Sequence, residues 1–193
     1  MSNLMYKASA QVFVHNLKNL SAILKFAASD AKTRGIDPAV LLNARLAPDM
    51  FALTRQVQIA TDHAKGCSAR LAGIEPPVFA DNETTFAELQ DRIKRVLDFI
   101  RGLKPAQFAG SESREIVIKM PIGTLAFNGQ DYLNGWVLPN FYFHYTSAYN
   151  ILRHNGVPVG KGHFLGAVPG MQMSGKIAKM MAGKTGARAK KKR

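Results

Sequence analysis

The sequence predicts a mainly α-helical fold, an antiparallel bundle of three or four long helices with a small β-hairpin before the last one. Three observations lead to this prediction. Apolar residues recur at helical spacing in the long segments of the chain, and glycine or proline follows the end of each segment. Only residues 111–128 change to the pattern of strands. Since most connections are short, a bundle is the economical way to pack three or four such helices.

The first long helix is expected over residues 3–29, where apolar side chains form one stripe and Gly35 follows as a stop. A short helix should then run to Asn43. Its start is indicated by Asp37, an N-cap residue, and by Pro38, which suits the first helical position.

The second and third long helices are expected over residues 48–71 and 85–103. Phe51, Leu53, Val57, Ile59 and Ala60 mark the buried side of the second helix. Thr85 and Glu88 have the spacing of a capping box, which predicts the start of the third.

The hairpin is expected to pair residues 114–120 with 124–127 around a turn at 121–123. The last long helix should cover residues 131–153. Pro139 lies inside this span, so the helix either kinks there or begins there with Leu138 extended.

Composition indicates one globular domain, expected over residues 1–168, because 47% of the 193 residues are hydrophobic and 20% are charged. The single cysteine, Cys67, excludes an internal disulfide and a zinc-finger framework. The N-terminus lacks a signal-peptide pattern and no window is apolar enough to span a membrane. We therefore expect a soluble, cytoplasmic protein that does not bind membranes.

The net charge of +13 is concentrated in a tail. Residues 157–193 carry nine Lys and Arg side chains and no acidic one, whereas the other 156 residues carry 17 basic and 13 acidic side chains. The segment 169–193 is expected to be a flexible basic tail. Such a tail either serves solubility alone or binds nucleic acid non-specifically, here through residues 170–193.

The five histidines do not form a recognisable metal motif, since neither HxxxH nor HExxH occurs. His144 and His154 are ten residues apart, so on one helix they lie ~15 Å apart and point in different directions. Asn140 lies one turn before His144. Asp62 and His63 are neighbours about 100° apart on the second helix, so at most one faces the core squarely. A solvated or hydrogen-bonded side chain is the simpler interpretation of each lone histidine.

Aromatic residues are dense in the last helix. Phe141 and Tyr145 belong to a stripe that core packing explains, whereas Tyr142, Phe143 and Tyr149 lie on other faces. An exposed aromatic face favours a homodimer. A pocket built by His144, Tyr145 and Tyr149, for an unknown small molecule, is the alternative.

Common catalytic motifs are absent from the sequence. The segment 160–162 (GKG) is too short for a phosphate loop, and there is no GxGxxG, Walker or GxSxG pattern. His63 lies one turn before Cys67, but a Cys–His nucleophile pair normally comes from separate elements.

Several stretches together resemble the DinB/YfiT-like superfamily, in one of its uncharacterised, domain-of-unknown-function branches. They are residues 54–65 (TRQVQIATDHAK), 70–75 (RLAGIE), 139–144 (PNFYFH), 150–156 (NILRHNG) and 160–161 (GK). The resemblance covers about residues 1–168. It implies an up-down-down-up four-helix bundle. Many members resemble metal-dependent enzymes, often thiol-linked transferases or isomerases, whose metal is held by one histidine of the second helix and an HxxxH pair of the last.

The resemblance places His144 on the second histidine of that pair and Asn140 on the first. On the second helix the ligand position falls near Gln56 or Gln58, and His63 is about a turn later. Metal or pocket candidates are therefore His144, Asn140, Gln58, Asp62, His63, Tyr145 and Tyr149.

Two functions follow from these residues. The first is a DinB-like ligand-binding or interaction module, dimeric and without a classical tri-histidine metal site. The second is a divergent metal-dependent transferase or isomerase in which His144, Asn140 and a carboxylate, glutamine or histidine of the second helix hold a divalent Zn, Ni or Fe ion.

Overall fold

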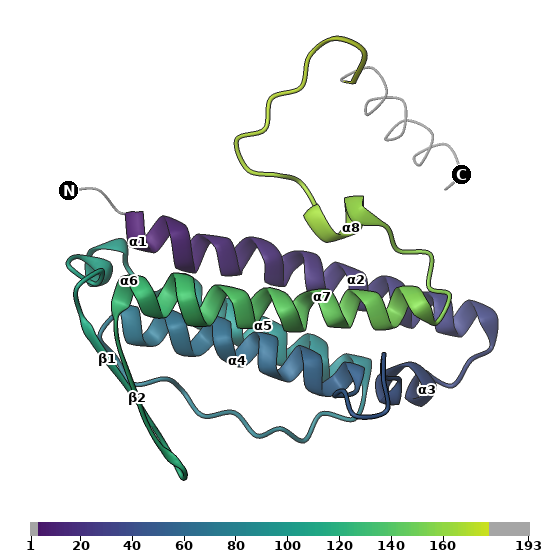
Figure 1. Cartoon of the computed structure of the whole chain (residues 1–193). Helices are drawn as coiled ribbons and strands as arrows, with labels where there is room; N and C mark the ends of the chain where they lie inside the picture. Colours follow the sequence, from purple (N-terminus) through teal and green to yellow (C-terminus); the bar gives the residue numbers. More distant parts are fainter. Residues whose placement is uncertain (1–3, 178–193) are drawn as a thin grey trace.

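The computed structural model of the protein describes residues 4–177. Its first long helix is built from α1 (Leu4–Tyr6), the π-helical turn η1 (Lys7–Gln11) and α2 (Val12–Arg34). The other long helices are α4 (Leu53–Leu71), α5 (Phe86–Gly102) and α7 (Leu138–His154). Figure 1 shows these helices side by side in one bundle, with a two-stranded hairpin at one end. The predicted fold class is confirmed.

The bundle is connected up-down-down-up. α2 and α7 run in one direction and α4 in the other (Figure 1). α5 is parallel to α4, because the two helices begin close together: Gln58, in the second turn of α4, donates at 2.9 Å to Glu83, which lies shortly before the first residue of α5. The segment 72–85, which we call the crossover, therefore returns along the whole length of the bundle to connect the end of α4 with the start of α5.

Local signals fix the starts of the short helix over residues 38–43 and of α5 as predicted. The Asp37 carboxylate accepts a hydrogen bond from the Ala39 amide at the start of α3 (Pro38–Asn43). Thr85 and Glu88 form both hydrogen bonds of the capping box at the start of α5. The first helix is longer than predicted and ends at Arg34, where Gly35 adopts a left-handed conformation with φ of 66°.

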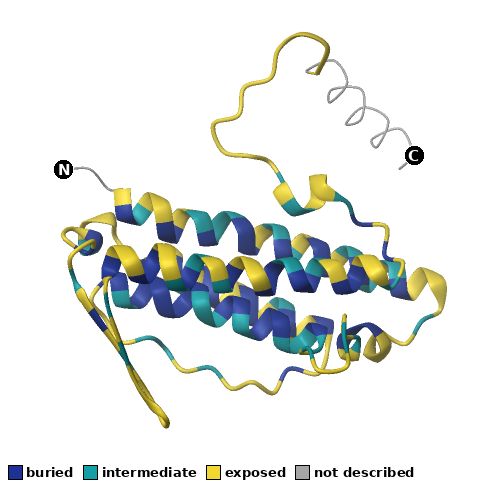
Figure 2. Cartoon of the chain, viewed as in Figure 1, coloured by how far each residue is buried: buried dark blue, intermediate teal, exposed yellow. Residues whose placement is uncertain are grey.

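The start of α4 was predicted too early. Ala52 is extended, so the helix begins at Leu53 and Phe51 lies before it, 52% exposed. The prediction that Phe51 belongs to the buried side of this helix is wrong. From Leu53 onward α4 is the most enclosed helix of the bundle and packs against α7 and α5 (Figure 2).

The hairpin pairs β1 (Glu115–Met120) with β2 (Gly123–Asn128) in antiparallel register, with Ile116 opposite Phe127. It projects from the end of the bundle (Figure 1). Ile116 is the one buried residue of the two strands. Ile116 belongs to the hydrophobic core of the bundle. Because an isolated hairpin is only marginally stable, this packing of Ile116 holds the hairpin to the helices.

The last long helix continues through Pro139. Leu138 is helical, and α6 (Gly129–Asp131) and the π-helical turn η3 (Tyr132–Val137) lead directly into α7. Proline lacks the N–H of a regular helical turn, and the wider turn before it accommodates this loss. A start at Pro139 with an extended Leu138 is therefore not what the structure has.

After α7 the chain forms α8 (Lys161–Leu165), which was not predicted, and its Phe164 packs on Tyr145. Of the predicted basic tail, residues 178–193 lie outside the described part of the chain, and the domain boundary at residue 168 stays a prediction. Within residues 4–177, none of the helices combines the length and apolar character that crossing a bilayer requires.

Candidate functional site

His144 is held in a defined orientation at the interface between α7 and α4. The residue is 8% exposed, and its Nδ1 lies 2.7 Å from Oε1 of Gln56. The Gln56 side-chain amide donates from Nε2 to the Phe51 carbonyl at 3.1 Å, which turns Oε1 toward the histidine. Because a carbonyl oxygen only accepts, Nδ1 of His144 carries the proton and Nε2 keeps its lone pair.

His63 lies against the same imidazole. The two rings stack with centroids 6.1 Å apart and planes 16° from parallel. Burial, and after it the neighbouring His144, lower the pKa of His63 to about 4. The pKa of His144 is also lowered, first by burial and then by the Arg55 charge. Both imidazoles are therefore neutral at pH 7.

Sequence reasoning placed His63 a turn beyond the expected ligand position of the second helix. In the structure Gln56 and His63 lie two turns apart on one face of α4, and His144 contacts both. The contact with His63 depends on how α7 is placed along α4, which the sequence pattern does not define.

The other polar candidates of α4 and α7 are engaged elsewhere. The Asn140 amide donates to the Trp136 carbonyl of its own helix at 2.7 Å. Gln58 donates to Glu83 at 2.9 Å, and Asp62 pairs with Arg92 and Lys65 at 2.8 and 2.9 Å. Gln58 and Asp62 thus bind the crossover and α5 rather than α7. In the described part of the chain, no group of three or more His, Cys, Asp or Glu side chains is placed to hold a metal ion.

Tyr145 and Tyr149 lie on the α8 side of the last helix, whereas His144 faces α4. The Tyr145 hydroxyl donates to the Phe164 carbonyl at 2.8 Å, and its ring stacks on Phe164 with centroids 4.2 Å apart. Tyr149 meets Phe164 edge-on. Phe143, 57% exposed, remains on the surface.

A fully buried arginine, which sequence reasoning missed, fixes the crossover. Arg92 of α5 is 0% exposed and forms ion pairs with Asp62 of α4 and with Asp81 and Glu83 of the crossover. The signal was available in the sequence, since position 92 lies among the apolar residues of α5 at helical spacing. This ion-pair cluster holds the crossover against the two parallel helices.

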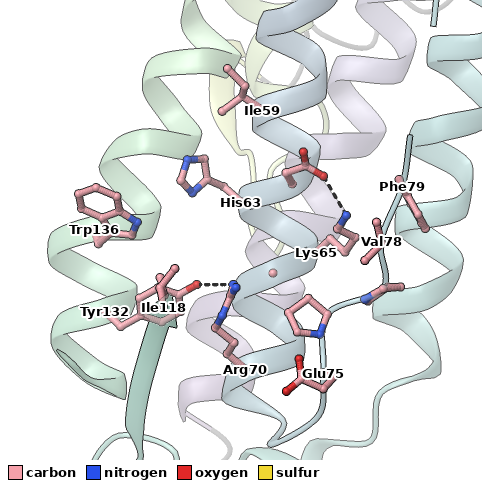
Figure 3. A pocket seen from close by; sticks show the side chains of 14 residues that line it. Ile59, His63, Lys65, Arg70, Glu75, Val78, Phe79, Ile118, Tyr132 and Trp136 are labelled. Atoms are coloured by element: carbon pink, nitrogen blue, oxygen red, sulfur yellow. Dashed lines mark hydrogen bonds and ion pairs between the residues drawn. The ribbon is translucent and has the colours of Figure 1, made fainter. Parts of the chain in front are cut away.

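Beside His63 the crossover lines an open pocket of about 520 Å³ (Figure 3). Its wall is formed by α4, residues 75–79 of the crossover, β1 and η3. Arg70 of α4 lines it and donates from Nη1 to the Tyr132 hydroxyl of η3 at 3.2 Å. Burial raises the pKa of Tyr132 to about 12, so its phenol is protonated at pH 7. Ile59, Ile118 and Trp136 supply apolar surface.

The fold agrees with the comparisons to known proteins. Residues 5–165 match the model of a domain of unknown function, DUF1993. The chain belongs to the DUF1993 family. A crystal structure of a DinB family member from Shewanella denitrificans is similar to this DUF1993 protein, with 44% sequence identity and a TM-score of 0.81. The match covers 88% of this chain and 96% of that one. No curated protein sequence matches the chain.

Membership of the DUF1993 family, with a DinB-like fold, confirms the resemblance seen in the sequence. The donors do not fit the tri-histidine metal centre that this resemblance implies. Two of its three positions are amides in this DUF1993 protein: Asn140 on α7, and Gln56 or Gln58 on α4. The side chains of all three residues are already hydrogen-bonded. An amide oxygen is a poor substitute for imidazole toward zinc or nickel.

Proposed function

We propose that this DUF1993 protein binds a small organic molecule in the pocket beside His63. The observation that carries the proposal is the convergence of three polar groups, His63, Arg70 and Tyr132, on one pocket with apolar walls. A volume of about 520 Å³ lies within the usual range of ligand pockets, roughly 300–1,000 Å³. A few placed polar groups on an apolar wall are also typical of such sites.

The pocket contains its own reporter. Trp136 is the single tryptophan of the chain and lines the pocket, so its fluorescence should respond to an occupant. We expect cyclohexanecarboxylate or its neutral amide, neither of which absorbs at the excitation wavelength of tryptophan, to change this fluorescence saturably and to raise the melting temperature.

Ile59→Phe narrows the pocket and should weaken this response. Ile74→Phe is the matched control, because Ile74 is exposed and does not line the pocket. A response of equal strength in both variants, or no response to either compound in the wild type, contradicts the proposal.

The alternative function, a divergent metal-dependent transferase or isomerase, is favoured by one observation: Nε2 of His144, beside His63, has no hydrogen-bond partner among residues 4–177. It is tested by metal analysis of protein purified without a histidine tag. Stoichiometric zinc, nickel or iron that disappears in His144→Ala supports the alternative. Metal-free protein that still binds the organic probes favours the ligand-binding function.

A homodimer and non-specific nucleic-acid binding stay predictions from the sequence. Sedimentation at several protein concentrations tests the first, and Phe143→Lys should weaken a dimer formed through the exposed aromatic face. Removal of residues 170–193 tests the second. It should abolish a nucleic-acid affinity that falls steeply with salt.

A further inference from the structure

Arg70 is the cation of the pocket that has no carboxylate partner among the residues that the structure describes. Two cationic side chains line this space, Lys65 and Arg70. Lys65 pairs with Asp62 at 2.9 Å and lies over the Phe79 ring. Among residues 4–177, no carboxylate lies within ion-pair distance of the Arg70 guanidinium, whose one hydrogen bond is to Tyr132. One positive charge of the pocket is therefore available to a ligand.

The edge of the Arg70 guanidinium formed by Nε and Nη2 is open to a ligand. Nη1 is engaged by the Tyr132 hydroxyl, and within the described residues Nε and Nη2 have no partner. Figure 3 shows Arg70 reaching from α4 toward Tyr132. Two parallel N–H groups of a guanidinium match the two oxygens of a carboxylate. Tyr132 thus positions Arg70 while leaving that pair of donors for another group.

Gly66 provides the space in which Arg70 lies. A Cβ atom at position 66 would come within 2.7 Å of Nη1 of Arg70. Glycine inside a helix is less favourable than alanine, so the sequence tolerates a weaker helix at this position. The glycine allows the guanidinium to lie against α4, one turn before its own Cα.

The remaining charges restrict the ligand to one negative charge. Glu75 also lines the pocket and has no ion-pair partner among residues 4–177. His63 contributes no charge at pH 7. A dianion would meet one available guanidinium and the repulsion of Glu75, whereas a monoanion is compensated by Arg70 alone.

We propose that Arg70 binds the carboxylate of a small organic monoacid, whose apolar body packs against Ile59, Ile118 and Trp136. This inference rests on the proposed function, since it names the class of ligand for the same pocket. Apolar surface beside the guanidinium lowers the local dielectric compared with bulk water, which strengthens an ion pair formed there.

The test compares three probes on the full-length protein at pH 7 by Trp136 fluorescence: cyclohexanecarboxylate, cyclohexanecarboxamide and inorganic phosphate. We expect the carboxylate to bind at least ~10-fold more tightly than the amide, as for a hydrogen bond to a charged group. Arg70→Gln should weaken carboxylate binding by a similar factor and leave amide binding unchanged. Arg70→Lys keeps the charge but loses the paired donors, so its affinity for the carboxylate should lie between those of the wild type and Arg70→Gln.

Three further variants separate binding from folding. Gly66→Ala should weaken carboxylate binding without lowering the melting temperature, because alanine favours the helix but displaces Arg70. Glu75→Gln should strengthen binding of the carboxylate and not of the amide. Arg153→Gln, an exposed arginine at the end of α7 outside the pocket, is the control and should change neither.

Each outcome decides something. Equal affinity for the acid and the amide, or unchanged acid binding in folded Arg70→Gln, overturns the carboxylate inference and leaves the pocket as a ligand site. Tighter binding of phosphate than of the monoacid overturns the restriction to one charge. Failure of both organic probes to bind overturns the proposed function and this inference with it. If Arg70→Gln does not fold, Gly66→Ala and Glu75→Gln decide the outcome.

Discussion

Acidification should destabilise this protein through His63, in a way that one substitution can isolate. The pKa of His63 is lowered from 6.5 to about 4 in the folded state, chiefly by burial. An unfolded chain returns this imidazole to water and to its ordinary pKa. Between these two values the unfolded state binds more protons than the folded state, so the free energy of unfolding rises with pH across this window.

The magnitude follows from the size of the shift. A difference of about 2.5 pKa units corresponds to about 3 kcal/mol at most, present in full above pH 6.5 and lost as the pH falls toward 4. Between pH 7.5 and pH 4.5 the loss should be about 2.5 kcal/mol. With a urea m-value of about 2 kcal/mol/M, the unfolding midpoint should shift by roughly 1 M.

Urea unfolding of the wild type and His63→Gln at both pH values measures this contribution. Carboxylates and His144 titrate in both proteins, so the difference between their pH dependences isolates His63. The wild-type midpoint should fall by roughly 1 M more than that of the variant. His154→Gln, which removes an exposed histidine at the end of α7, controls for the loss of a histidine as such. Parallel pH profiles for the wild type and His63→Gln would refute the reasoning from burial.

Two further predictions concern the scaffold of the site. Arg92→Leu leaves the buried Glu83 without its main partner and should lower the free energy of unfolding by about 3–5 kcal/mol. Arg95→Leu, at an exposed position, should lower it by less than about 1 kcal/mol in the same denaturation experiment. Gly129→Ala places a Cβ 1.8 Å from the Ser111 carbonyl oxygen and should lower the free energy of unfolding by roughly 1–3 kcal/mol or more. Gly135→Ala, with open space around its Cβ, should leave the melting temperature unchanged or raise it slightly. Equal effects within either pair would contradict the structural explanation.

Local chemistry allowed most of the fold to be predicted from the sequence. The caps at Asp37 and Thr85 and the strand period before Gly129 act over a few residues, and the structure has all of them. Phe51 was misplaced because one extended residue, Ala52, delays the helix, and α8 was missed in a segment rich in glycine and proline.

The site was less predictable because its contacts connect distant segments. Whether Asp62 or His63 faces α7 depends on where the two helices meet, and helical period alone leaves this open. Arg92 is buried in the structure beside two carboxylates of the crossover, Asp81 and Glu83, which lie outside the helical pattern of α4 and α5. Arg70 was not singled out, since a basic residue in the last turn of a helix is expected there for the helix dipole alone.

The up-down-down-up connection has a consequence for the order in which the molecule assembles. Gln56 and His144 are 88 positions apart, and Arg70 and Tyr132 are 62 apart. During synthesis α4 therefore leaves the ribosome long before the helix that covers it. The side chains of α4 that later contact α7 therefore stay exposed in an incomplete bundle. Because these contacts are distant in sequence, folding should be slower than in helical proteins dominated by local contacts. Pocket formation and the docking of α7 should consequently be one late event.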